Sequence, residues 1–135
     1  EKNFDSVSSH LKKSENSNVN ILPFSNNLFE MILNSDLVVS RAGAGTCVEL
    51  EAAGVQSILI PLAIAPGDHQ RKNAHDIVAK GNGVILDEKD LNGTSLYSNI
   101  VENLENNTTI GKTVNSIHVI ANIEIAKYII SKYLV

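Results

Sequence analysis

The stretch from Ser40 to Glu49 reads Ser-Arg-Ala-Gly-Ala-Gly-Thr-Cys-Val-Glu, a glycine-rich turn between an apolar run and a helical stretch. The apolar run, Leu37 to Val39, has the β-branched, continuous character of a strand that is buried on both faces. Val48 to Ala53 has helical character and begins just after the glycines. We therefore expect the turn to lie at the carboxyl end of a strand and to open directly into a helix.

A helix that begins at such a turn favours an anion. Its first backbone N–H groups have no partner within the helix, and the positive end of the helix dipole lies there. Gly43 and Gly45 let the backbone come close to a phosphate or diphosphate. Glu49 follows about one helical turn later, where its carboxylate can accept hydrogen bonds from two ribose hydroxyls. The alternatives are a tight turn whose glycines serve packing only and an ordinary solvated glutamate.

Composition narrows the function classes. The chain has 135 residues, of which 43% are hydrophobic and 19% charged, as expected for a single globular domain. A net charge of −4 and the absence of a dense basic stripe argue against nucleic acid as the main partner. The longest apolar run, Ile58 to Ala65, is interrupted by Pro61 and is too short to span a membrane. The single cysteine, Cys47, excludes an internal disulfide, and we interpret it as a small buried residue rather than a reactive thiol.

Strand-like and helical segments alternate along the chain. Strands are expected at 19–22, 37–39, 57–61 and 83–86, and helices at 4–13, 27–34, 46–53, 69–80, 96–104 and 119–134, with Gly54 and Gly81 ending two of the helices. This alternation predicts an α/β fold, a Rossmann-like parallel sheet with helices on both faces. Ligands of such sheets bind beyond the carboxyl ends of the strands, where we expect the loops after Leu22, Val39 and Pro61 to meet.

Several short motifs follow one another in a recognisable order. They are Pro23-Phe24, the run from Asn34 to Thr46, Glu49-Leu50, Ala52-Ala53-Gly54, Ser57 to Pro61, Asp68-His69-Gln70 and Asn73-Ala74. As a set, from about Val19 to Leu86, they resemble the C-terminal, nucleotide-sugar-binding half of the MurG family of bacterial N-acetylglucosaminyltransferases. The resemblance implies the C-terminal lobe of a two-lobed GT-B glycosyltransferase. Residues 1–135 then form one UDP-sugar-binding domain, with the N-terminal lobe and first strand outside the chain.

The same resemblance implies which residues bind UDP-N-acetylglucosamine. Phe24 and Ser25, just past a strand end, are expected to hold the uracil, although Phe24 has the alternative of a core aromatic. Glu49 is expected to bind the ribose, and His69 and Gln70 the sugar hydroxyls. The helix start supplies the diphosphate site and the remaining donor-binding positions: Ala44, Gly45, Thr46, Cys47 and Val48.

The implied reaction is transfer of GlcNAc, with inversion, to the C4 hydroxyl of a lipid-linked MurNAc-pentapeptide. We assign no catalytic base, metal or cofactor to this chain: His69 is not expected to act as a base, and there is no Asp-x-Asp motif. The base, the acceptor site and the peripheral contact with the cytoplasmic face of the bacterial inner membrane are expected in the N-terminal lobe. The isolated chain is accordingly expected to lack transfer activity.

Two other functions stay open at this stage. One is a separate donor-binding subunit like that of the GlcNAc transferase that makes dolichol-linked chitobiose. The other is a lobe of a GT-B-fold UDP-GlcNAc 2-epimerase, although such lobes usually carry a Ser-Gly-Gly turn instead of Ala-Gly-Ala-Gly. Arg41 could contact a phosphate or pair with an acidic neighbour. Three histidines, His10, His75 and His118, are expected at the surface of helices.

Overall fold

The computed structural model describes residue 9 and residues 19–64 and 66–106. Its centre is a parallel sheet of three strands, β1 (Val38–Ser40), β2 (Ser57–Leu59) and β3 (Gly83–Ile85), in the order β1-β2-β3. Val39 pairs with Ile58, which in turn pairs with Val84. The predicted parallel sheet is therefore confirmed. The helices expected at 4–13 and 119–134 lie outside the described residues.

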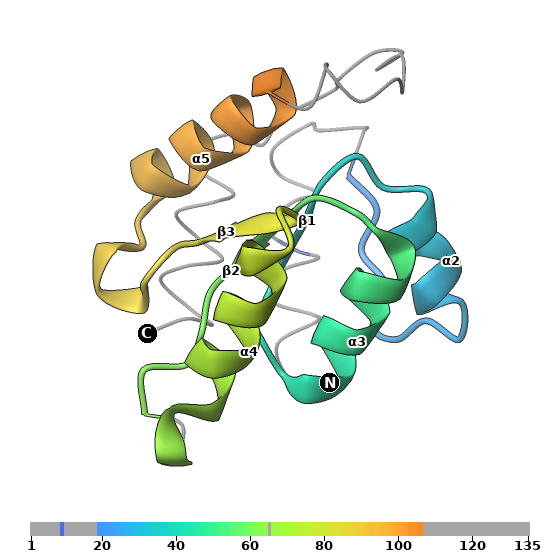
Figure 1. The fold of residues 1–135 in the computed structure, drawn as a ribbon. Coiled ribbons are helices and arrows are strands. Elements are labelled where there is room, and N and C mark those ends of the chain that lie inside the picture. The colour runs from blue at the N-terminus through green and yellow to red at the C-terminus, as the bar shows by residue number, and fades with distance from the viewer. Residues whose placement is uncertain (1–8, 10–18, 65, 107–135) are drawn as a thin grey trace.

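Helices cover both faces of the sheet (Figure 1). The crossover from β1 to β2 contains α3 (Ala44–Ala53), and that from β2 to β3 contains the short 3-10 helix η1 (Pro66–Asp68) and α4 (His69–Ala79). A second 3-10 helix, η2 (Glu88–Asp90), leads to α5 (Gly93–Asn106), while α2 (Leu28–Leu33) precedes the sheet and contacts α3. Consecutive parallel strands with helical crossovers are the βαβ arrangement that the alternation predicted.

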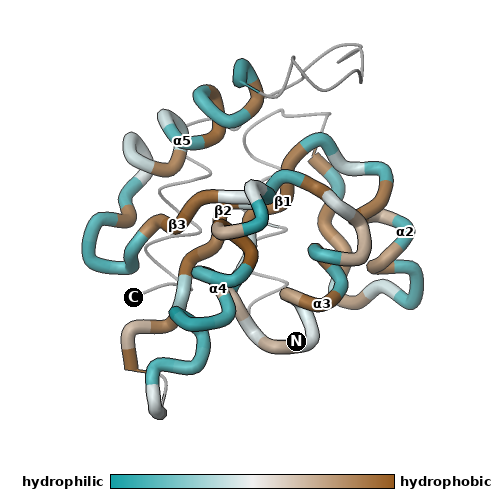
Figure 2. Tube along the Cα trace, viewed as in Figure 1, coloured by the Kyte–Doolittle hydropathy of each residue, from teal (hydrophilic) through white to brown (hydrophobic). Residues whose placement is uncertain are grey.

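Alternating residues of the strands form two apolar clusters, one on each face. On one side Leu59 packs with Leu50 of α3, Ile77 of α4 and Ile32 of α2. On the other side Ile58 packs with Leu96 of α5. In Figure 2 the strands have mostly apolar colour, and much of α4 has hydrophilic colour. The period of two along each strand thus explains how a sheet this small is buried from both sides.

Two glycines illustrate why the backbone takes this path. Gly54 ends α3 with φ of 61°, a left-handed conformation that side chains disfavour. Gly83 lies so close to β2 that a Cβ atom there would come within 2.6 Å of the Ser57 carbonyl oxygen. The predicted helix stop at Gly54 is confirmed, as is the one at Gly81, where φ is 81°.

Three expectations about elements were wrong. Residues 19–22 do not form a strand, because no described backbone hydrogen bonds pair them with β1. The strand at 37–39 is not buried on both faces: Val39 is 41% exposed, since within the described residues β1 lies at the edge of the sheet. Finally, α3 begins at Ala44, earlier than the predicted Thr46, so Gly45 belongs to the helix and not to the turn.

No helix within the described ranges combines the length and the apolar character that crossing a bilayer requires.

Candidate functional site

The loops that follow the three strands lie together at the carboxyl ends of the strands, where α3 and α4 also begin (Figure 1). The β1 loop runs from Arg41 to Gly43, and the β2 loop runs from Ile60 toward α4. The β3 loop leads from Leu86 into η2. The sequence predicts a ligand at this end of the sheet.

The start of α3 offers unpaired backbone donors. Gly43 is the N-cap residue, and the first helical bond runs from the Cys47 amide to the Gly43 carbonyl at 2.9 Å. No side chain caps the helix, and the amides of Ala44, Gly45 and Thr46 have no acceptor among the described residues. The first turn carries no acidic side chain, and a Cβ atom on Gly45 would meet nothing within 4 Å. Open donors, open space and a positive dipole end fit an anion.

Asn73 of α4 fixes the turn that precedes these donors. Its side-chain nitrogen donates to the carbonyl oxygen of Ala42 at 3.1 Å, and Ala42 itself is fully buried. The turn is therefore held from the neighbouring helix, and its geometry does not depend on a ligand. The Asn73-Ala74 motif was recognised in the sequence, but this role was not.

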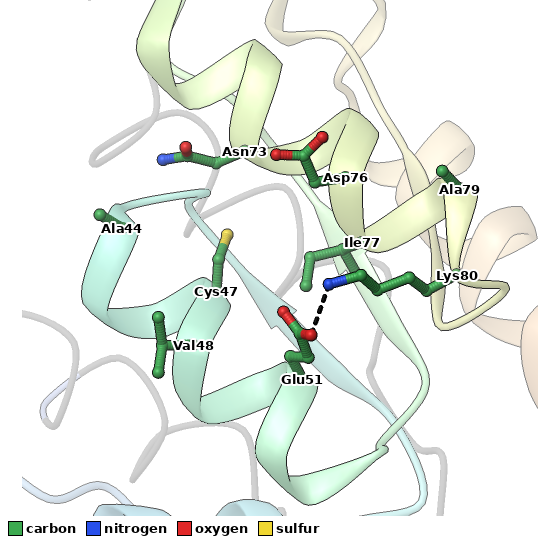
Figure 3. Close-up of a pocket in the computed structure, with 9 residues that line it drawn as sticks. All are labelled: Ala44, Cys47, Val48, Glu51, Asn73, Asp76, Ile77, Ala79 and Lys80. Carbon is green, nitrogen blue, oxygen red and sulfur yellow. Dashed lines mark hydrogen bonds and ion pairs between the residues drawn. The ribbon is translucent and has the colours of Figure 1, made fainter.

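Glu49 and Glu51 lie on the same helix but differ in their contacts. Glu51 forms an ion pair with Lys80 of α4, which is drawn in Figure 3. Glu49 is partly buried, and its carboxylate makes no hydrogen bond or ion pair with any residue in the described ranges. A carboxylate without a partner in the described part of the chain, about one helical turn beyond the open amides, is available to a ligand.

A cluster of polar contacts ties the β2 loop to its neighbours. Gln70, which is expected to contact the sugar, accepts a hydrogen bond from the Leu62 amide at 3.0 Å through its Oε1 atom. Its side-chain NH₂ group donates no hydrogen bond to the residues that the structure describes. His69 is exposed and follows Asp68, a residue in the left-handed conformation. Gln70 thus has one part that holds the loop and another that is free.

Arg41 pairs with an acidic residue, which was one of the two alternatives for it. Its guanidinium donates to the Ile60 carbonyl at 3.2 Å and to Glu88 Oε1 at 2.6 Å. The other oxygen of Glu88 accepts from the Ala63 amide at 2.9 Å. These hydrogen bonds, that of Ala63 first, keep the pKa of Glu88 below its ordinary value. The sequence placed Glu88 only in an acidic turn, but its position after β3, at the same end of the sheet, was a usable signal.

Three of the predicted donor-binding residues line a groove between α3 and α4 of about 480 Å³ (Figure 3). They are Ala44, Cys47 and Val48. Cys47 is buried, as predicted, and burial, with a smaller effect of the Asp76 charge, raises the pKa of its thiol. Thr46 and Glu49 do not line this groove. The predicted donor-binding residues of α3 therefore do not all line one groove.

Phe24 and Ser25 lie apart from that groove. They line a shallow hollow of about 620 Å³ beside α2, together with Asn27 and Met31. Phe24 is 78% exposed, so the alternative of a core aromatic is wrong. Ser25 accepts from the Asn27 amide at 3.1 Å and thereby helps to start α2. Neither Phe24 nor Ser25 lines the groove between α3 and α4.

The remaining predictions are about the exposure of the histidines and about metal binding. His75 is exposed, as expected, whereas His10 and His118 lie outside the described residues. Within the described part of the chain, no three histidine, cysteine, aspartate or glutamate side chains are grouped so that they could hold a metal ion.

Comparison with known proteins identifies the family. Residues 1–127 match the glycosyltransferase family 28 C-terminal domain. The chain belongs to this family, and the expected Rossmann-like GT-B lobe and the resemblance to the MurG family are thereby confirmed. No solved structure gives a significant match.

The relatives share one name. The UDP-N-acetylglucosamine--N-acetylmuramyl-(pentapeptide) pyrophosphoryl-undecaprenol N-acetylglucosamine transferase of Bacillus cytotoxicus is 46% identical over 111 residues, or 82% of this chain and 30% of that protein. The protein of the same name from Leuconostoc citreum is 44% identical over 81 residues, or 60% of this chain and 22% of that protein. The chain thus spans about 30% of the length of the Bacillus cytotoxicus relative.

Proposed function

We propose that residues 1–135 form the donor-binding domain of a two-lobed N-acetylglucosaminyltransferase whose donor is UDP-N-acetylglucosamine. The observation that carries this proposal is the start of α3. Three backbone amides there, and the carboxylate of Glu49 further along the helix, have no partner among residues 19–64 and 66–106. Amides suit the diphosphate of a nucleotide sugar, and a carboxylate suits its ribose hydroxyls. The names of the relatives support this donor.

The geometry also suits the leaving group of glycosyl transfer. When the bond from the anomeric carbon to the phosphate oxygen breaks, negative charge increases on the diphosphate. Backbone donors that already point at that position stabilise the charge without reorganising. We assign this role to the amides of Ala44, Gly45 and Thr46, which follow the turn held by the contact between Asn73 and Ala42.

The acceptor follows from the relatives. We propose a lipid-linked MurNAc-pentapeptide whose C4 hydroxyl attacks the anomeric carbon with inversion, releases UDP and gives the hydroxyl proton to a base outside residues 1–135. The site for this acceptor, and peripheral contact with the cytoplasmic face of the bacterial inner membrane, would likewise belong to the other lobe. The proposal rests on the names of the relatives and on the family match.

The test uses the complete natural protein that contains this chain. With purified lipid-linked MurNAc-pentapeptide and labelled UDP-GlcNAc, we expect label in the lipid product and an equal amount of UDP. UDP-glucose and UDP-N-acetylgalactosamine are the matched donors and are expected to react poorly. Transfer that depends on a second, membrane-bound polypeptide would favour a separate donor-binding subunit. Conversion of UDP-GlcNAc without acceptor to the 2-epimer would establish an epimerase instead.

A further inference from the structure

Glu88 connects the three loops at the carboxyl ends of the strands. It follows β3, pairs with Arg41 after β1 at 2.6 Å, and accepts from the Ala63 amide after β2 at 2.9 Å. Arg41 in turn donates to the Ile60 carbonyl at 3.2 Å. A single carboxylate and a single guanidinium therefore fix both ends of the segment from Ile60 to Ala63.

The pair is more than an exposed ion pair. The side chains of Arg41 and Glu88 are only 29% and 18% exposed, and both oxygens of the carboxylate accept hydrogen bonds. Exposed pairs contribute little because water competes with them and their side chains must be ordered. Here both oxygens of one carboxylate are used, one by the Arg41 guanidinium and one by the Ala63 amide, so removal of the side chain takes away both acceptors at once.

The segment held by Glu88 is also the one that Gln70 contacts. The Leu62 amide donates to Gln70 and the next amide, that of Ala63, donates to Glu88. The position of Gln70, and of the free NH₂ group at its end, therefore depends on a loop whose other anchor is Glu88. The open amides of α3 are fixed separately, by Asn73.

We infer that Glu88 is a positioning residue for the sugar of the donor: through the Ala63 amide and Arg41 it holds the β2 loop so that Gln70 faces the hexose. This inference rests on the proposed function, because it assumes that the ligand at this end of the sheet is a nucleotide sugar. It separates two parts of the site, a diphosphate part that does not depend on Glu88 and a sugar part that does.

The decisive variant is Glu88→Gln in the complete protein. Glutamine has about the same size, but an NH₂ group that cannot accept replaces one of the two oxygens, so either Arg41 or Ala63 loses its present acceptor. We expect the Kd for UDP-GlcNAc to rise about tenfold, the loss of roughly one hydrogen bond, while the Kd for UDP changes by less than about twofold. In amide hydrogen exchange, the Ala63 amide should exchange faster.

Glu102→Gln is the control. It removes the carboxylate of an exposed glutamate on α5, which packs against the face of the sheet opposite to α3 and α4. It is expected to leave both dissociation constants unchanged. Arg41→Lys is the second variant, because lysine keeps the charge but cannot donate to Ile60 and Glu88 through separate nitrogens. It should show the same selective loss of UDP-GlcNAc and decides the question if Glu88→Gln does not fold.

The outcomes separate the two proposals. If the wild-type protein binds UDP-GlcNAc but Glu88→Gln binds it equally well, or loses UDP and UDP-GlcNAc to the same extent, the positioning role is overturned and the proposed function stands. If the wild-type protein does not bind UDP-GlcNAc, the proposed function fails and the positioning role fails with it.

Discussion

α3 and α4 both begin at the carboxyl ends of the strands, but their N-cap residues and backbone amides differ. At α3 the N-cap is Gly43, the first turn has no acidic side chain, and three amides are open. At α4 the N-cap residue is Asp68, whose carboxylate lies 3.8 Å from Arg71. The two loop amides before α4, those of Leu62 and Ala63, already donate to side chains.

This difference indicates how the same end of the sheet can recognise both the diphosphate and the sugar of the donor. An anion next to an unoccupied helix start is stabilised by typically about 0.3–1 kcal/mol from the dipole alone, in addition to its hydrogen bonds. Asp68 already places a negative charge beside α4, so a diphosphate favours α3. The first turn of α4 also carries an uncharged polar side chain, that of Gln70, which the β2 loop contacts through the Leu62 amide. Such a group suits the hydroxyls of a sugar.

Gly43→Asp tests the difference between the two helix starts most directly, because it gives α3 an acidic residue at the N-cap position, where α4 has Asp68. Gly43 has φ of −66° and ψ of 150°, which aspartate adopts readily, and a Cβ atom there meets only Thr46 Oγ1 at 4.0 Å. The new carboxylate accepts from the open amides and repels the diphosphate. We expect affinity for UDP and UDP-GlcNAc to fall about a hundredfold or more, the loss of two charge-assisted hydrogen bonds.

The thermal unfolding midpoint of Gly43→Asp should stay equal to that of the wild type or rise, since aspartate is a good cap. Gly43→Ala, which adds a side chain but no charge, is the control and should lose much less affinity. Isothermal titration with both ligands measures these effects. Wild-type affinity in Gly43→Asp would place the diphosphate elsewhere.

Glu49→Ala tests the second feature of α3, its unpaired carboxylate. Loss of one or two charge-assisted hydrogen bonds to the ribose should raise the KM for UDP-GlcNAc by roughly ten- to a hundredfold. Glu51→Ala, on the same helix but paired with Lys80, should leave KM unchanged. With 2′-deoxy-UDP-GlcNAc, the wild type should discriminate against the analogue and Glu49→Ala should hardly do so. Equal discrimination by both proteins would remove Glu49 from the ribose.

The sequence predicts those parts of the fold that depend on local pattern. The strands around Val38, Ile58 and Val84 and the helix stops at Gly54 and Gly81 follow from apolar runs and from the conformational freedom of glycine. The exposure of Val39 could not be predicted, because it depends on whether another strand covers the edge of the sheet. The early start of α3 was missed because glycine has a low helix propensity, although the first turn tolerates it.

In the candidate site, too, the sequence predicts local features but not contacts between distant residues. Glycines before a helix predict open amides, and the structure shows them at Ala44 to Thr46. The sequence singled out Glu49 by its distance from the glycines, but it could not show that Glu51 pairs with Lys80, because that contact depends on how α4 lies beside α3. Likewise, Arg41 and Glu88 are 47 residues apart in the sequence, and only the order of the strands brings their loops together.

Gln70→Glu tests whether the start of α4 recognises the sugar. Glutamate keeps an oxygen that can accept from the Leu62 amide but lacks the NH₂ donors. We expect affinity for UDP-GlcNAc to fall about five- to tenfold and affinity for UDP to stay unchanged. Gln70→Ala, which also removes the anchor of the loop, should lose more. If Gln70→Glu binds UDP-GlcNAc like the wild type while Gln70→Ala is impaired, Gln70 serves only to hold the loop.

The smallest expected effect concerns the pH dependence of the anchor at Glu88. The Ala63 amide, and after it Arg41, lower the pKa of Glu88 from 4.5, so the folded state binds this proton less readily than the unfolded state. The resulting stabilisation is fully present above pH 4.5 and is lost as the pH falls through the lower folded pKa. Wild type and Glu88→Gln should therefore differ in thermal unfolding midpoint at pH 7 and converge toward pH 3. Glu51→Gln, whose pair is far more exposed, should show little difference at either pH. A difference between wild type and Glu88→Gln that is independent of pH would show that the carboxylate holds the β2 loop by shape and not by charge.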